Sequence, residues 1–292
     1  MQSYYEATAR ERIIGILDKG SWREILPPTT RTLSPHLAAL DLPAAFDDGV
    51  VIGSGALDNL PVLLASQEGG FMGGAVGEIQ GAKIVGLFER AKAQRVAGIV
   101  LLLESGGVRL QEANAGLIAV SEVIRAICAA RVRGTPVVAA IGGKFGCFGG
   151  MGIAAGCCTR IVMSEEGRLG LSGPEVIETA RGVEEFDSLD RALVWRTVGG
   201  KHRFLLGDCA MLVDDRQAAF REALARALRA GENLSLESVQ HEQQILEERL
   251  ARFGSHTDGE DIWRDLGFDK PANVPLLATD ALVALSQQTR AA

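Results

Sequence analysis

Apolar residues along the chain follow two alternating patterns. Continuous apolar runs of strand length occur at 98–105 and 135–143, as expected for strands that are buried on both faces. Between them, over 114–131, apolar residues recur at steps of three and four, which predicts an amphipathic helix. These apolar positions are Leu117, Val120, Ile124 and Ile127. Strand, glycine-rich turn, helix and strand in succession are typical of an α/β protein.

The rest of the chain continues this alternation. The pattern predicts helices over 6–18, 77–95, 149–158, 218–230 and 236–254, a hairpin over 47–67 and two short strands within 160–173. Asp58 and Asn59 suit the turn of the hairpin. The helices at 218–230 and 236–254 are charged, with a narrow apolar face. Either both pack on the core with solvated outer faces, or one of them docks a partner subunit.

Composition narrows the possible classes. The 292 residues are 47% apolar, which allows a sizeable core, and the net charge of −7 argues against a general nucleic-acid or membrane-surface binder. The N-terminus lacks the apolar core of a signal peptide, and no run of 18 apolar residues predicts a membrane span. The 35 glycines cluster, which indicates specific backbone geometry.

Cysteine usage favours a cytoplasmic protein. The five cysteines are odd in number, lie in apolar or glycine-rich contexts and form no CxxC motif, so we interpret them as reduced, mostly buried thiols. They are Cys128, Cys147, Cys157, Cys158 and Cys209. The four histidines are scattered without metal-ligand spacing, so no metal site is expected.

Familiar catalytic motifs are missing. The chain has no G-x-S-x-G sequence and no Walker A loop. "GMGIAA" at 150–155 matches the form of a dinucleotide fingerprint, but no acidic residue ends a second strand about 20 residues further on. Ser105 has no histidine or lysine near it in sequence, which makes it a poor nucleophile.

Two glycine turns suggest catalysis by the backbone instead. "SGGV" at 105–108 and "CFGG" at 147–150 each lie between an expected strand and an expected helix. The first N–H groups of a helix have no intrahelical partner, and the helix dipole favours negative charge there. If the turns face each other, two N–H groups form an oxyanion hole for a thioester carbonyl that becomes an enolate. The alternative is a pair of tight turns without a ligand.

Several segments resemble the acyl-CoA carboxyltransferase subunits. "ESGGVRLQEANAGL" at 104–117 resembles their SGG-[AV]-R-x-QE signature, and "FMGGAVGEIQGAKI" at 71–84 and "ARERIIGILDKGSWREI" at 9–25 resemble two other segments of that group. Within the group, the chain is most similar to the beta subunits of biotin-independent malonate decarboxylases. The stretches that carry this likeness are 146–158, 168–178, 184–208 and 261–268. This likeness covers nearly the whole chain. The chain also lacks the four-cysteine zinc ribbon of bacterial acetyl-CoA carboxylase beta subunits.

The resemblance implies a fold and partners. The expected fold is α/β and crotonase-like (ClpP/crotonase), a spiral of ββα units with additional C-terminal helices. Residues 1–292 would form a single carboxyltransferase-type domain, with an N-terminal helical extension at 1–45 and a C-terminal helical region at 215–292. It also implies a gamma-like partner subunit of related fold, with the active site at their interface, and an acyl-carrier subunit that bears a phosphoribosyl-dephospho-CoA arm. No biotin, metal or covalently bound cofactor is expected on this chain.

The resemblance also implies the site residues. The oxyanion donors would be Val108, which follows Gly107, and either Gly149 or Gly150, of which we favour Gly150. Three further residues, Met72, Gly73 and Gly74, would let the prosthetic arm lie against the backbone.

Two side chains beside the turns have competing roles. Arg109 could pair with the leaving carboxylate or bind the arm, but an ion pair with Glu112 three residues on is the alternative. Cys147 is interpreted as a small buried filler. The residue that protonates the carbanion cannot be named.

Three functions remain open at this stage. The first is a carboxy-lyase subunit that decarboxylates malonyl thioester to acetyl thioester and CO2 through an enolate. The second is a subunit of a biotin-dependent acyl-CoA carboxyltransferase. The third is a non-catalytic scaffold for the carrier protein. CO2 release from malonyl thioester without biotin distinguishes the first from the second.

Overall fold

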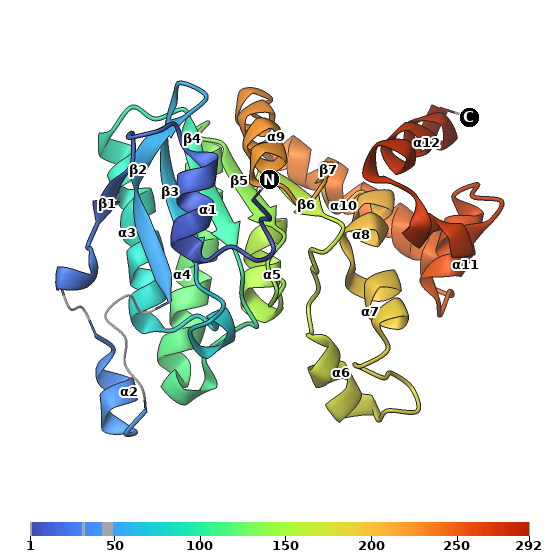
Figure 1. Ribbon diagram of the computed structural model, residues 1–292, viewed down its shortest axis with the longest axis horizontal. Coiled ribbons are helices and arrows are strands. Elements are labelled where there is room, and N and C mark those ends of the chain that lie inside the picture. Colours follow the sequence, from blue (N-terminus) through green and yellow to red (C-terminus); the bar gives the residue numbers. More distant parts are fainter. Residues whose placement is uncertain (1, 31–32, 43–48, 292) are drawn as a thin grey trace.

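The computed structural model describes residues 2–30, 33–42 and 49–291. Its strands form a seven-stranded sheet in which neighbours along the chain are also neighbours in the sheet (Figure 1). The strands are β1 (Arg23–Ile25), β2 (Val50–Leu57), β3 (Leu60–Gln67), β4 (Gly98–Leu103), β5 (Val137–Ile141), β6 (Arg160–Ser164) and β7 (Met211–Val213). The first three strands pair antiparallel and all later pairs are parallel. The sheet is therefore mixed, and the chain crosses it from one edge to the other in sequence order. Together with the helices between the strands, this confirms the α/β fold class.

The predicted hairpin is formed by β2 and β3. Leu57 and Leu60 face each other at its closed end. Between them Asp58 and Asn59 have φ values of 51° and 63°, the left-handed pair that a two-residue hairpin turn requires. Residues 47–48 of the predicted range lie outside the described residues.

Helices cover both faces of the sheet (Figure 1). One face packs against α3, α4 and α5, and the other packs against α1 and α9. The α-helices are α1 (Ala9–Ile16), α2 (Pro35–Ala39), α3 (Glu78–Ala93), α4 (Asn114–Val132), α5 (Gly149–Gly156), α6 (Pro174–Arg181), α7 (Arg191–Val198), α8 (Gly200–Leu206), α9 (Gln217–Arg229), α10 (Leu236–Phe253), α11 (Gly259–Asp265) and α12 (Thr279–Ala291). Short 3-10 helices are η1 (Pro28–Thr30), η2 (Met72–Gly74), η3 (Leu110–Glu112) and η4 (Pro271–Leu276).

The two cores explain the continuous apolar runs. In β4, Ile99, Leu101 and Leu103 pack into the core that includes α3 and α4, whereas Val100 and Leu102 pack into the core that includes α1 and α9. All six residues of β4 are buried. The prediction that this strand is buried on both faces is therefore confirmed.

One predicted strand is wrong and two strands were missed. Only β6 forms within 160–173, because the chain after it turns across the ends of the parallel strands, and Leu169 makes just an isolated bridge to Cys147. A Cβ on Gly167 would lie 2.4 Å from the carbonyl oxygen of Ile141, so the turn needs glycine there. The missed strands β1 and β7 have three residues each, too few to show an alternating pattern. Because β1 falls within 1–45, that segment is not helical throughout.

The two charged helices of the C-terminal region differ from each other. The core-packing interpretation is confirmed for α9, which buries Phe220, Ala223, Leu224 and Leu228 among its residues. The same interpretation is wrong for α10, which has no buried residue. The helices α10, α11 and α12 extend away from the sheet at its β7 end (Figure 1).

Candidate active site

The glycine turns meet above the carboxyl ends of the parallel strands. After β4 the chain runs through 105–108, and after β5 it runs through 147–150. Isolated parallel bridges join Val76 to Val108, Ser105 to Cys147 and Cys147 to Leu169. These bridges form a short second layer beside the main sheet, and it is this layer that positions the turns.

The two turns touch through glycine. A Cβ on Gly149 would lie 3.0 Å from the Cα of Gly107, and one on Gly107 would lie 3.6 Å from the Cα of Gly149. Both residues have positive φ values, 126° at Gly107 and 59° at Gly149. The close approach and the backbone conformation both select glycine at these positions.

Two N–H groups in the turns have no acceptor within the described part of the chain: those of Val108 and Gly150. In the first turn, the N–H groups on both sides of Val108 are engaged. The N–H of Gly107 donates to Ser105 Oγ at 3.2 Å, and that of Arg109 donates to the Val76 carbonyl at 2.9 Å. Both Val108 and Gly150 are half-buried, so neither residue is fully enclosed in the core.

The choice between Gly149 and Gly150 has a geometric basis. The N–H of Gly149 donates to the Leu171 carbonyl at 2.9 Å and is not available to a ligand. A Cβ on Gly150 would lie 3.3 Å from Val108 Cγ2, so the two residues with unpaired N–H groups are neighbours in space. The arrangement can offer two donors to one oxygen.

The segment Met72–Gly74 lies beside the first turn. The carbonyl of Gly73 accepts a hydrogen bond from the N–H of Gly106 at 2.8 Å. A Cβ on Gly74 would lie 2.0 Å from the Glu104 carbonyl oxygen, so glycine at 74 is explained by backbone packing alone. A Cβ on Gly73 would have only Phe145 nearby, at 4.0 Å, and Met72 and Gly73 are half-buried. The open side of this segment is therefore at Met72 and Gly73.

The structure gives Arg109 an ion pair. Its guanidinium is buried, with Nη1 3.0 Å from Glu112 Oε1 and Nη2 donating to the Ala75 carbonyl at 3.0 Å. Burial alone would raise the pKa of Glu112. The hydrogen bond from the Glu78 N–H, together with the Arg109 charge, holds that pKa below its ordinary value instead. The ion-pair alternative for Arg109 is thus confirmed, and through it Arg109 fixes the chain just after Val108.

Sequence reasoning missed a second buried ion pair beneath the turns. Arg12 on α1 pairs with Glu104, directly after β4, and both side chains are nearly inaccessible to solvent. The other carboxylate oxygen of Glu104 accepts a hydrogen bond from the N–H of Phe145 at 3.1 Å. Glu104 therefore ties the first helix to both glycine turns. Both residues lie in segments that carried the family resemblance, but neither had been given a role.

Cys147 lies within the turn but does not face the cleft. Its side chain is fully buried, and burial raises the pKa of its thiol. A thiol held protonated in this way is a poor nucleophile, so the interpretation as a buried filler is confirmed. Cys158 and Cys209 are also buried, while Cys128 and Cys157 are half-buried, and all five are free thiols.

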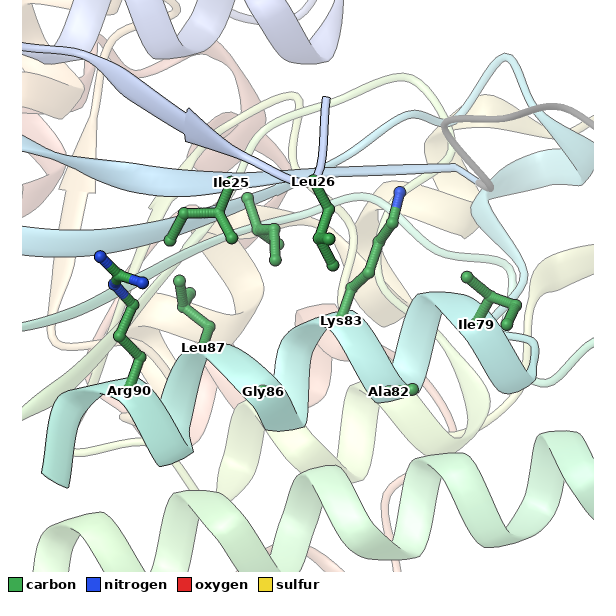
Figure 2. Close-up of a pocket in the computed structure, with 9 residues that line it drawn as sticks. Ile25, Leu26, Ile79, Ala82, Lys83, Gly86, Leu87 and Arg90 are labelled. Atoms are coloured by element: carbon green, nitrogen blue, oxygen red, sulfur yellow. The ribbon is translucent and has the colours of Figure 1, made fainter. Parts of the chain in front are cut away.

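Two cavities lie away from the turns. One, of about 340 Å³, is lined by Ile25 and Leu26 on one side and by α3 on the other, with Lys83 and Arg90 at different turns of that helix (Figure 2). The other, of about 550 Å³, lies among α7, α8, α11 and η4 and includes Trp195 and Trp263. Neither contains a residue of the two turns.

Comparison with known proteins assigns the chain to a family. A family model described as a carboxyl transferase domain matches residues 5–200. The malonyl-S-ACP:biotin-protein carboxyltransferase MADC of Malonomonas rubra is 38% identical over 317 aligned residues, covering 99% of this chain and 97% of that protein. The chain therefore belongs to the carboxyl transferase domain family.

Solved structures agree with this assignment. A Pseudomonas malonate decarboxylase hetero-tetramer in complex with malonate contains a chain that is 40% identical with a TM-score of 0.83, over 90% of this chain and 97% of that one. The transcarboxylase 12S structure with methylmalonyl-coenzyme A and methylmalonic acid bound is 25% identical with a TM-score of 0.63, over 76% of this chain and 40% of that one. These neighbours have the crotonase fold, so the expected fold family is confirmed.

The described residues lack both a metal-binding cluster and a membrane-spanning helix. No group of three or more histidine, cysteine, aspartate or glutamate side chains is arranged to hold a metal ion. None of the helices in the described ranges combines the length and the hydropathy needed to cross a membrane.

Proposed function

We propose that this chain is the beta subunit of a malonate decarboxylase and that it acts in the cytoplasm. With a gamma-like partner subunit, it would convert malonyl thioester on an acyl-carrier subunit to acetyl thioester and CO2. The observation that carries this proposal is the pair of N–H groups on Val108 and Gly150 that have no acceptor among the described residues and belong to two turns in contact. The likeness to the Pseudomonas malonate decarboxylase structure and to MADC supports malonyl thioester as the substrate.

The proposed reaction needs a stabilised oxygen and no nucleophile from this chain. When the bond to the carboxylate breaks, its electron pair moves onto the thioester, CO2 leaves and the carbonyl oxygen becomes an enolate oxygen. The N–H groups of Val108 and Gly150 donate to that oxygen most strongly when its charge is greatest, and each donor is worth about 3–4 kcal/mol in the transition state.

Protonation of the carbon then completes the product. Near the turns, Glu104 is held by Arg12 and the thiol of Cys147 is buried and protonated. We therefore assign the proton to the gamma-like partner or to water at the subunit interface.

The prosthetic arm would approach at Met72 and Gly73. The backbone there is open because a Cβ on Gly73 would be 4.0 Å from its nearest neighbour, Phe145. A phosphoribosyl-dephospho-CoA arm on the carrier subunit supplies the thiol that carries the malonyl group. In this proposal neither biotin nor a metal ion takes part, and Arg109 holds Val108 in position rather than touching the arm.

The second candidate is a carboxyltransferase subunit that passes the carboxyl group to biotin. The likeness to MADC, a malonyl-S-ACP:biotin-protein carboxyltransferase, favours it. Both reactions use the same enolate, so the geometry of the turns supports each of them. The fate of the carboxyl group separates them.

The deciding experiment uses the complex purified with its partner and carrier subunits. CO2 release from malonyl-carrier is measured with and without avidin, which sequesters biotin. Decarboxylation that avidin leaves unchanged supports the proposed function, whereas inhibition by avidin assigns the chain to the biotin-dependent reaction. Turnover that is unaffected by changes at Val108 and Gly150 would leave only a scaffold role.

A further inference from the structure

The long helix α10 exposes apolar side chains that the fold does not use. None of its residues is buried, and Leu236 and Leu250 are 75% and 72% exposed. Polar contacts attach the helix to the rest of the chain: Arg249 Nη1 lies 2.7 Å from Asp208 Oδ1, and Arg252 donates to the Asp265 carbonyl. Packing within this chain therefore does not account for the apolar side chains of α10.

Their spacing is that of a coiled-coil seam. The seam positions are Leu236, Val239, Gln243, Leu246, Leu250 and Phe253. Successive members are three and four residues apart, so they form one stripe along the helix. Val239 and Leu246 are also exposed, and Gln243 is the one polar member. A stripe of this period is complementary to another helix.

We propose that α10 is a self-association surface and that it pairs antiparallel with α10 of a second copy of this chain. Antiparallel pairing sets Leu236 opposite Phe253 and Val239 opposite Leu250 of the other copy. Gln243 then faces Leu246. Each seam residue and the residue opposite it form one layer of the pair, which gives six layers. Four layers are entirely apolar, and each of the two central layers pairs Gln243 with Leu246.

The charges beside the seam favour the antiparallel arrangement. It brings Glu242 of one copy to the side of the helix where Arg249 of the other copy pairs with its own Asp208, and this approach of opposite charges occurs twice because of the two-fold symmetry. In parallel pairing, Glu242 would instead face Glu247 of the second copy, and like charges repel. Parallel pairing would also set Gln243 against Gln243. The sequence of α10 is thus complementary to itself in one direction only.

Equilibrium sedimentation of the full chain tests the proposal. Leu250→Glu buries a charge in the seam and should weaken self-association at least about 100-fold. Gln243→Leu replaces the one polar seam position and should strengthen it about tenfold. Leu250 is exposed and no residue of α10 is buried, so neither substitution should disturb the fold. The circular dichroism spectrum should therefore not change.

Gln244→Leu is the matched control. Gln244 donates to Glu248 at 2.9 Å, just as Gln243 donates to Glu247 at 2.9 Å, so both substitutions remove the same kind of bond within the helix. Gln244 lies off the seam, and its variant should associate like the wild-type chain. Equal effects of the two substitutions would mean that the seam is not the contact.

Cross-linking tests the direction of pairing. An equimolar mixture of Val239→Cys and Leu250→Cys chains should give a covalent dimer with a short bis-maleimide, beyond the background of the native cysteines. Val239→Cys alone should not, because the two copies of that position would be about 16 Å apart along the antiparallel pair. If the wild-type and Gln243→Leu chains are both monomeric at every concentration measured, self-association is refuted. A Leu250→Glu defect seen only in assembly with other subunits would then assign the seam to a different protein.

Discussion

Gly107 and Gly149 come from different turns, yet a Cβ added to Gly149 would lie 3.0 Å from the Cα of Gly107. The contact brings together the two turns that follow β4 and β5, and it leaves the N–H groups of the next residues, Val108 and Gly150, without acceptors in the described ranges. In the proposed site the donors are backbone groups, and the ion pairs of Arg109 with Glu112 and of Arg12 with Glu104 hold the surrounding chain in place.

A substitution at Gly150 tests how tightly the site is packed. If the thioester binds beside Gly150, a branched side chain there blocks it, so Gly150→Val should turn over at least 100-fold more slowly. The structure adds a different effect: a Cβ on Gly150 would point at Val120, 2.6 Å from its Cγ1. We therefore expect Gly150→Ala to reduce the free energy of unfolding by about 1–3 kcal/mol.

The rescue variant makes this prediction specific. Val120→Ala removes the clashing methyl groups, so the double variant should be more stable than the sum of the two single effects predicts. Urea unfolding of the four proteins gives the coupling energy. Simple additivity would show that Val120 does not limit the space at position 150.

The strands and helices that position the site could largely be read from the sequence. Continuous apolar runs predicted the buried strands β4 and β5, and α4 is long enough to show its helical period. The contact between Gly107 and Gly149 could not be read, since nothing local records which turns meet. The same holds for Arg12 and Glu104, which are 92 residues apart and pair only after the sheet has formed. Sequence reasoning could propose Gly150 over Gly149 only by resemblance, whereas the hydrogen bond from Gly149 to Leu171 supplies a physical reason.

Thiol alkylation tests the role of Cys147. Burial raises the pKa of the Cys147 and Cys158 thiols, so neither should react with iodoacetamide in the native protein. Mass spectrometry should find the first slow modification at the half-buried Cys128 or Cys157. Fast labelling of Cys147 that abolishes turnover, with protection by a malonyl thioester, would place this thiol in the active site after all.

Stability should depend on His202 at mildly acidic pH. Burial, followed by the nearby charge of Arg203, lowers the pKa of His202 to about 4, and its Nδ1 has no hydrogen-bond partner among the described residues. The unfolded chain takes up this proton near pH 6.5 and the folded chain only near pH 4, so the folded state loses stability as pH falls through that window. The full loss is roughly 3 kcal/mol.

A neutral variant isolates this effect from other acid-sensitive groups. The glutamine of His202→Gln is not protonated in this range. Between pH 7 and pH 4, the wild type should therefore lose roughly 3 kcal/mol more of its unfolding free energy than the variant does. Urea unfolding at several pH values measures the difference. If it stays constant across the range, His202 is protonated equally easily in both states.

Two variants of Val108 test the backbone mechanism most directly. Val108 should act through its N–H, so Val108→Ala should keep most of the activity, because the donor remains. Val108→Pro removes the N–H that has no acceptor within the described residues, and should cost roughly 3 kcal/mol of transition-state stabilisation, about 100-fold or more in rate. CO2 release from malonyl-carrier by the assembled complex gives both rates.

The proline needs a folding control because it fixes φ at 108 and restricts Gly107 before it, whose φ is 126°. The side chain of Val108 also packs near Gly116, where a Cβ would lie 3.0 Å from its Cγ1, so alanine itself should cost a little stability. Circular dichroism and co-purification with the gamma-like partner show whether each variant still folds and assembles. If the alanine and proline variants assemble and are equally active, the turn at 105–108 only supports the fold, and the enolate oxygen must be held by other donors.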